Sequence, residues 1–203
     1  MRLETESEPV GFTAETTPVL DIRGLAQDFE LPDRLVHAVV DVNLTAHGGQ
    51  VTALVGESGS GKSVTSLTVM GIEDKNARIR RGEIYLSGVE TLHMKKKERR
   101  FYVSRHAGMI FQEPMDSLNP LLTVGYQLTE AARVHENLTQ KQARALAMEQ
   151  LKAVSLPQPE ELMKQYPFML SGGMCQRVMI AIAAISRPPL LIADEPTTAL
   201  DVT

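Results

Sequence analysis

A phosphate-binding loop is the clearest chemical feature of this 203-residue sequence. Glycines, a lysine and a serine follow the spacing GxxxxGK[ST], in which glycines let backbone N–H groups wrap around phosphate oxygens. We expect Lys62 to reach the β- and γ-phosphates and the hydroxyl of Ser63 to bind Mg²⁺, so the motif predicts binding of Mg²⁺–ATP. The motif comprises Gly56, Glu57, Ser58, Gly59, Ser60, Gly61, Lys62 and Ser63.

Two adjacent carboxylates follow an apolar run and could supply the hydrolytic chemistry. Leu190–Ala193 is typical of a buried strand, and Asp194 and Glu195 come directly after it. Asp194 is expected to hold Mg²⁺, and Glu195 is expected to polarise the attacking water as a general base. Alone, the same pattern would indicate a strand followed by a solvated acidic turn. The presence of a phosphate-binding loop favours the catalytic interpretation.

A third motif, Ser171-Gly172-Gly173, stands directly before a predicted helix. A hydroxyl, flexible glycines and a helix N-terminus together suit an anion. By itself this motif predicts only a helix cap.

The three motifs in this order resemble those of the ATP-binding cassette (ABC) family, over nearly all of residues 18–203. In that family the Leu170–Gly173 signature closes on ATP bound to a second subunit. Gln112 matches the family's Q-loop glutamine, which implies a place beside Mg²⁺ and the reacting water. Thr198–Asp201 matches its D-loop, so Asp201 is counted among the nucleotide-site residues. Phe29 stands about where the family has an aromatic that stacks on adenine, and a core strand position is the alternative.

Longer stretches are similar to the peptide, nickel and glutathione importers within that family, including Phe111–Pro120 and Ala193–Thr203. This resemblance implies an ATP-hydrolysing subunit at the cytoplasmic face of the cell membrane. It also implies a second ATPase subunit, in a homodimer or a heterodimer, and transmembrane permease subunits. A solute-binding protein would be an indirect partner, and nucleic acid would not be one. Another small-solute importer is the alternative within the class.

The elements that must position these motifs alternate between strands and helices. We expect an α/β fold: a RecA-like P-loop core with an antiparallel β subdomain and an inserted α-helical subdomain at about residues 113–171. Residues 1–17 are expected to form a flexible acidic tail before the ATP-binding domain at 18–203. The expected strands are Val19–Ile22, Leu25–Phe29, Val36–Leu44, Val51–Val55, Gly82–Leu86, Met109–Phe111 and Leu190–Ala193, and the expected helices are Ser63–Met70, one behind the Thr139/Gln142 capping box, and one from Ser171 to about Ser186.

Composition argues against a protein that binds nucleic acid. The net charge of −4 and the absence of Trp argue against a nucleic-acid surface. The basic run Lys95–Lys97 with Arg99 and Arg100 is therefore expected to be a solvated helix face. The one cysteine, Cys175, can form no internal disulfide. It stands where the importer group usually has arginine, and it is either a neutral substitution or a reactive thiol with a lowered pKa at a helix N-terminus.

Two rival interpretations stay open. A soluble ABC ATPase of DNA repair or translation is the first, although the segment between Gln112 and Leu170 has no room for the long coiled coil of chromosome-type members. A truncated fragment with little turnover is the second. The family has a histidine after the D-loop, but no histidine of this sequence follows Glu195. We therefore expect a C-terminally incomplete chain with exposed apolar sheet surface, weak ATP binding and slow hydrolysis.

Overall fold

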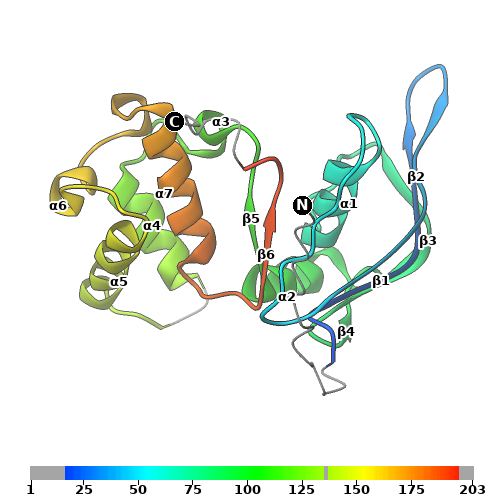
Figure 1. Ribbon diagram of the computed structural model, residues 1–203, viewed down its shortest axis with the longest axis horizontal. Helices are drawn as coiled ribbons and strands as arrows, with labels where there is room; N and C mark the ends of the chain where they lie inside the picture. The colour runs from blue at the N-terminus through cyan, green and yellow to red at the C-terminus, as the bar shows by residue number, and fades with distance from the viewer. Residues whose placement is uncertain (1–16, 135–136, 197–203) are drawn as a thin grey trace, which may run out of the picture.

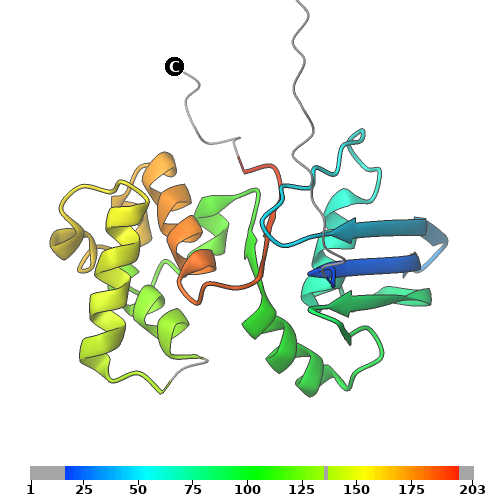
Figure 2. The same ribbon diagram turned by 60° about the horizontal axis from the view of Figure 1, so that its bottom comes forward.

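The computed structural model describes residues 17–134 and 137–196. Three parts lie side by side in Figure 1: an antiparallel sheet on the right, two parallel strands in the centre and a block of helices on the left. The view in Figure 2 keeps the same order. This arrangement confirms the expected α/β class with an antiparallel sheet and an added helical part. The expected tail, apart from Thr17, and the D-loop residue Asp201 lie outside the described residues.

The antiparallel sheet has the strand order β2-β1-β3-β4. We expected Gly24 to separate two short strands, but β1 runs through it. Gly24 has a φ of 56°, and the pairing register shifts between Ile22 and Leu25 on either side of it. A glycine in the left-handed region therefore makes a bulge here instead of ending the strand. The strands are β1 (Leu20–Glu30), β2 (Leu35–Ala46), β3 (Ala77–Leu86) and β4 (Val89–Glu90).

The parallel pair consists of β5 (Ala107–Ile110) and β6 (Leu190–Ala193). Ile110 lies opposite Ala193 at the end of the ladder, so both strands stop at the same edge. All four residues of β5 are buried, whereas β6 alternates between half-buried and exposed residues. The sequence therefore predicts the position of β6 correctly but overstates its burial.

The expected strand Val51–Val55 is absent, and this prediction is wrong. The segment has no regular secondary structure, and Val51 and Val55 are 100% and 90% exposed. A strand needs a hydrogen-bonded neighbour. Within the described residues β6 pairs only with β5, and no strand lies along this segment. Helix α1 (Lys62–Met70) nevertheless follows it as expected.

The helical block has its own apolar core, which includes Leu128, Leu151 and Val178. Local signals set its boundaries. The hydroxyl of Thr139 accepts from the backbone N–H of Gln142, whose side chain is the reciprocal partner, so the predicted capping box is present. The elements of the block are α3 (Pro114–Ser117), α4 (Val124–Arg133), α5 (Gln140–Ala153), α6 (Pro159–Leu162), the 3₁₀ helix η1 (Pro167–Met169) and α7 (Gly172–Ala184).

The basic run lies on α2 (Lys96–His106), and its expected solvation is only partly correct. Lys96, Lys97 and Arg100 are exposed, but Arg99 is only 6% exposed. Arg99 forms an ion pair with Glu73 at 2.9 Å, and this pairing makes burial of the guanidinium possible. Charge density along a sequence does not reveal which member of a run turns inward.

A buried carboxylate joins three strands of the antiparallel sheet. Asp28 on β1 is 2% exposed, and its Oδ1 accepts from His37 Nδ1 on β2 and from Arg80 Nε on β3, both at 2.8 Å. Burial alone would raise the pKa of this carboxyl. The hydrogen bonds from His37 and Arg80, together with the charge of Arg80, outweigh burial and lower the pKa of Asp28 below its usual value.

Asp28→Asn should destabilise the protein at pH 7 and should also flatten its acid sensitivity. Because the pKa of Asp28 is lower in the folded state, its contribution is complete above the unfolded pKa, about 3.9. That contribution is lost as the pH falls through the folded pKa. Urea unfolding between pH 7 and pH 2.5 measures both effects. Asp41→Asn, which removes an exposed ion pair with Arg81 on the same sheet, is the control and should change little. Parallel stability–pH curves for wild type and Asp28→Asn would contradict this assignment.

Candidate active site

The loop before α1 has the backbone geometry of an anion cradle. Gly59 and Gly61 have φ values of 79° and 92°, which glycine adopts without strain. A Cβ on Gly61 would lie 2.7 Å from the carbonyl oxygen of Ala38 on β2, so a side chain does not fit there. Gly61 is also the N-cap of α1 and supplies no side-chain cap. Backbone N–H groups of the first turn are therefore left for a ligand.

Lys62 lies within the curve of this loop. Its Nζ donates to the carbonyl oxygens of Gly56 and Glu57, both at 2.8 Å. The ammonium group is thus held next to the N-terminus of α1, and two positive features converge on one place. This is the arrangement that binds the phosphates of a nucleotide.

The acidic strand end lies at the carboxyl edge of the parallel pair. The backbone N–H of Asp194 donates to the carbonyl oxygen of Ile110 at 2.9 Å, which continues the ladder by one residue. Glu195 then turns away with a φ of 46°. Its Oε2 accepts a hydrogen bond of 2.7 Å from Nε2 of Gln112. The structure therefore brings together two residues that are 83 positions apart in the sequence.

A cavity of about 240 Å³ connects these groups. A cation, helix N–H groups, an amide and a carboxylate all face one space. The lining residues are Ala38, Ser58, Gly59, Gly61, Lys62, Ser63, Val64, Gln112 and Glu195.

The residues predicted for Mg²⁺ have the right donors for that ion. Ser63 offers a hydroxyl, Asp194 a carboxylate and Gln112 an amide oxygen, and Mg²⁺ prefers oxygen ligands with substrate phosphates and water. Ser63 and Gln112 line the cavity, and Asp194 lies one residue from Glu195. Among the described residues, no group of three or more His, Cys, Asp or Glu side chains is arranged to hold a metal ion.

Other predicted site residues lie away from this cavity. Ser171, Gly172 and Gly173 form the N-terminus of α7, where the Ser171 hydroxyl accepts from the backbone N–H of Met174 at 3.3 Å. They do not line the cavity, so their predicted contact with ATP requires a second subunit. Phe29 is half-buried on β1 and is not a lining residue either. Its stacking role stays a prediction.

Cys175 is not a reactive thiol. It is fully buried in the core of the helical block, and its Sγ donates to the carbonyl oxygen of Pro167 at 3.5 Å. Burial raises the pKa of this thiol, which is opposite to the lowering that reactivity needs. The reactive interpretation is wrong, and the side chain acts as a small apolar filler.

Two features of the site have no clear signal in the sequence. Ala38 lines the cavity from β2 and closes it beneath Gly61. Buried Thr68 on α1 and Arg99 on α2 form a polar contact at the other end of the phosphate-loop helix. The only sign of the second feature in the sequence is a threonine on a helix face that is otherwise apolar.

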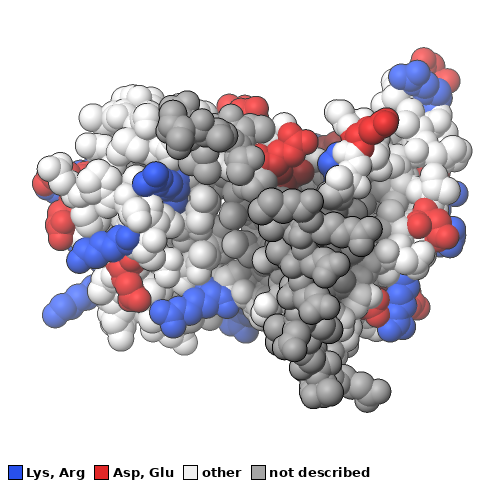
Figure 3. Space-filling view, in the orientation of Figure 1, with Lys and Arg blue, Asp and Glu red and all other residues white. Residues whose placement is uncertain are grey.

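On the face drawn in Figure 3, basic and acidic side chains are interspersed over the helical block.

Comparisons with known proteins agree with this geometry. The family model described as "ABC transporter" matches residues 39–198. The probable D,D-dipeptide transport ATP-binding protein DdpD of Escherichia coli is 46% identical over 93% of this chain and 58% of its own length. The oligopeptide transport ATP-binding protein OppD of Escherichia coli is 43% identical over 99% of this chain and 59% of its own length. The chain thus spans less than two thirds of these relatives.

Solved structures show the same fold. The dimeric, post-hydrolysis structure of the ATP-binding cassette MJ0796 bound to ADP and Pi is 28% identical and has a TM-score of 0.81. The match covers 90% of this chain and 76% of that one. A cbiO1 structure from Clostridium perfringens, described as part of the transporter complex cbiONQ, has a TM-score of 0.71 at 27% identity. The match covers 91% of this chain and 68% of that one.

Among the described residues, no helix combines the length and the apolar composition of a membrane-spanning segment.

Proposed function

The chain belongs to the ABC transporter family, and we propose that it is the subunit that binds and hydrolyses ATP to drive a peptide importer. One observation carries the proposal: Lys62, the N-terminus of α1 and the Gln112–Glu195 pair face a single cavity. The similarity to dipeptide and oligopeptide transport ATP-binding proteins supports the choice of solute class.

In this proposal each residue has a defined task. Lys62 and the loop amides bind the β- and γ-phosphates, and Glu195 accepts a proton from the attacking water. The amide of Gln112 orients Glu195 through the bond described above. Ser63, Asp194 and Gln112 would hold Mg²⁺, which would supply charge neutralisation at the phosphates.

Assembly would complete the site. Ser171, Gly172 and Gly173 of a second ATPase subunit would close over the nucleotide, with Asp201 near that interface and Phe29 against adenine. Transmembrane permease subunits would dock near Gln112 and place the protein at the cytoplasmic face of the membrane. A solute-binding protein would deliver the peptide to them. Within the chain, residues 113–171 would form the helical subdomain of an ATP-binding domain at 18–203, behind an acidic tail at 1–17.

Co-purification from detergent-solubilised membranes tests the assignment to an importer. A tagged chain should recover permease subunits with several membrane-spanning helices, and recovery should respond to nucleotide because closure of the ATPase pair moves the docking surface. A tagged Lys62→Ala chain serves as the control for nucleotide-dependent recovery. Recovery of only DNA-repair or ribosomal proteins would instead favour a soluble ABC ATPase.

A further inference from the structure

The helix that carries the phosphate-binding residues depends on polar as well as apolar contacts. Helix α1 presents Lys62 and Ser63 at its first turn, yet its buried residues are Thr65, Thr68 and Val69, two of which are polar. The segment that leads into the loop, residues 51–57, forms no strand. Its C-terminal turn, where Thr68 and Val69 are buried, therefore contributes to its direction.

Thr68, in the last turns of α1, connects the helix to the antiparallel sheet. Its hydroxyl lies 2.5 Å from Oε1 of Gln27 on β1 and 2.7 Å from the carbonyl oxygen of Val64. Thr68 and Gln27 are 0% and 1% exposed. Buried polar groups depend on such partners, so the contact fixes one side of the helix end.

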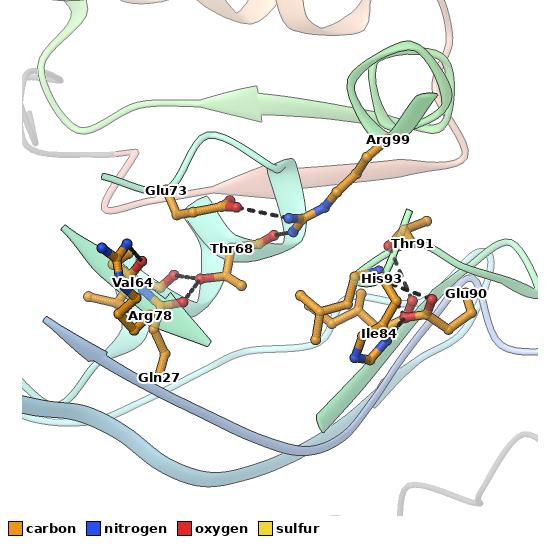
Figure 4. Close-up of polar contacts among 12 residues, drawn as sticks. Gln27, Val64, Thr68, Glu73, Arg78, Ile84, Glu90, Thr91, His93 and Arg99 are labelled. Atoms are coloured by element: carbon orange, nitrogen blue, oxygen red, sulfur yellow. Dashed lines mark hydrogen bonds and ion pairs between the residues drawn. The ribbon is translucent and has the colours of Figure 1, made fainter. Parts of the chain in front are cut away.

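Arg99 holds the same turn from the other side. Nη2 of its guanidinium donates to the carbonyl oxygen of Thr68, and Nη1 donates to Glu73 just beyond the helix, as Figure 4 shows. Gly71, the C-cap of α1, has a φ of 68°, and a Cβ there would lie 3.3 Å from Nε of Arg99. The guanidinium thus packs over the glycine at the negative end of the helix dipole.

We propose that Arg99 is a positioning residue for the nucleotide site, because it fixes the C-terminal turn of α1 and thereby the place where Lys62 and Ser63 meet the phosphates. The inference rests on the function proposed above. A nine-residue helix is about 13 Å long, so a tilt of about 10° at one end moves the other by roughly 2 Å. A displacement of that size is larger than a hydrogen bond tolerates.

The geometry also explains why the residue is arginine. The planar guanidinium reaches a backbone carbonyl and a carboxylate at the same time, in a fixed fork. A lysine at this position would keep the positive charge but could satisfy one of the two acceptors well. Arg99→Lys is therefore expected to be partly defective, not neutral.

Affinity for a fluorescent ATP analogue with Mg²⁺ and amide hydrogen exchange along α1 test the proposal together. Arg99→Met should weaken nucleotide binding on the order of 10-fold, as expected for a misplaced binding group, and Arg99→Lys should have a smaller effect. In Arg99→Met, exchange should become faster at Thr65, whose N–H donates to the carbonyl oxygen of Gly61, as well as beside Thr68. The control is Arg100→Met, the exposed neighbour on the same helix, which should match wild type in both measurements.

Two results would overturn the inference. Unchanged affinity in Arg99→Met, with faster exchange confined to residues 67–73, would make Arg99 a local stabiliser of the helix end. If Arg99→Met does not fold, unchanged affinity in Arg99→Lys would be decisive in the same way. A wild-type chain that binds no nucleotide would instead refute the proposed function, and the exchange pattern would still report whether Arg99 controls the far end of α1.

Discussion

Lys62→Ala will raise the dissociation constant for Mg²⁺–ATP by about 100-fold or more. Each hydrogen bond from a charged donor contributes about 1.5–3 kcal/mol, and an ammonium in the phosphate cradle makes at least two. The structure adds a second loss. The Nζ bonds to Gly56 and Glu57 also hold the loop in its curve, so the variant loses both the cation and an internal brace.

Equilibrium dialysis with labelled ATP measures this effect directly. Lys97→Ala, which removes an exposed lysine on α2, is the matched control and should bind ATP as wild type does. Lys62→Met keeps most of the side-chain length but loses both the charge and the two donated bonds, so it should be as defective as Lys62→Ala. Unchanged affinity in Lys62→Ala would refute the assignment of the phosphate-binding loop.

Glu195→Gln is expected to lower ATP turnover by about 10²–10⁴-fold, the usual contribution of a general base. Glutamine has nearly the same shape, and its amide oxygen can still accept from Nε2 of Gln112, which lies 2.7 Å from the carboxylate. Binding of ATP should therefore survive. In the proposed dimer hydrolysis would separate the subunits, so the expected product of Glu195→Gln is an ATP-bound dimer that does not reopen.

Phosphate release at saturating Mg²⁺–ATP gives the turnover, and size-exclusion chromatography with ATP gives the dimer. Glu113→Gln is the control, because Glu113 is an exposed carboxylate next to Gln112 that does not line the cavity. Equal kcat in wild type and Glu195→Gln would move the role of general base to another group.

Features encoded by short-range rules were predictable from the sequence. The phosphate loop, helix α1, the capping box at Thr139 and the start of α7 at Ser171 all depend on residues within one or two turns. Each motif specifies its own backbone geometry. These predictions therefore needed no knowledge of the rest of the chain.

Features that depend on distant partners were not predictable in this way. An apolar run becomes a strand only beside another strand, and residues 51–55 have none among the described residues. Arg99 is buried because Glu73 and the carbonyl of Thr68 meet it from a different helix and loop. The contact between Gln112 and Glu195 likewise depends on the pairing of β5 with β6.

The shared end of β5 and β6 has a consequence for how the chain can change in length. Ile110 and Ala193 are paired, and the two site residues Gln112 and Glu195 each stand two positions beyond that pair. The paired ends of β5 and β6 therefore set the distance between Gln112 and Glu195, because each of these residues is joined to its strand by a segment of the same length. An inserted or deleted residue between Ile110 and Gln112, or between Ala193 and Glu195, would move one of the two site side chains away from the other by about 3.3 Å, the rise of a single extended residue. Insertions in exposed turns of the helical block lie outside these two segments and leave the distance between Gln112 and Glu195 unchanged, so evolutionary changes in length should collect there.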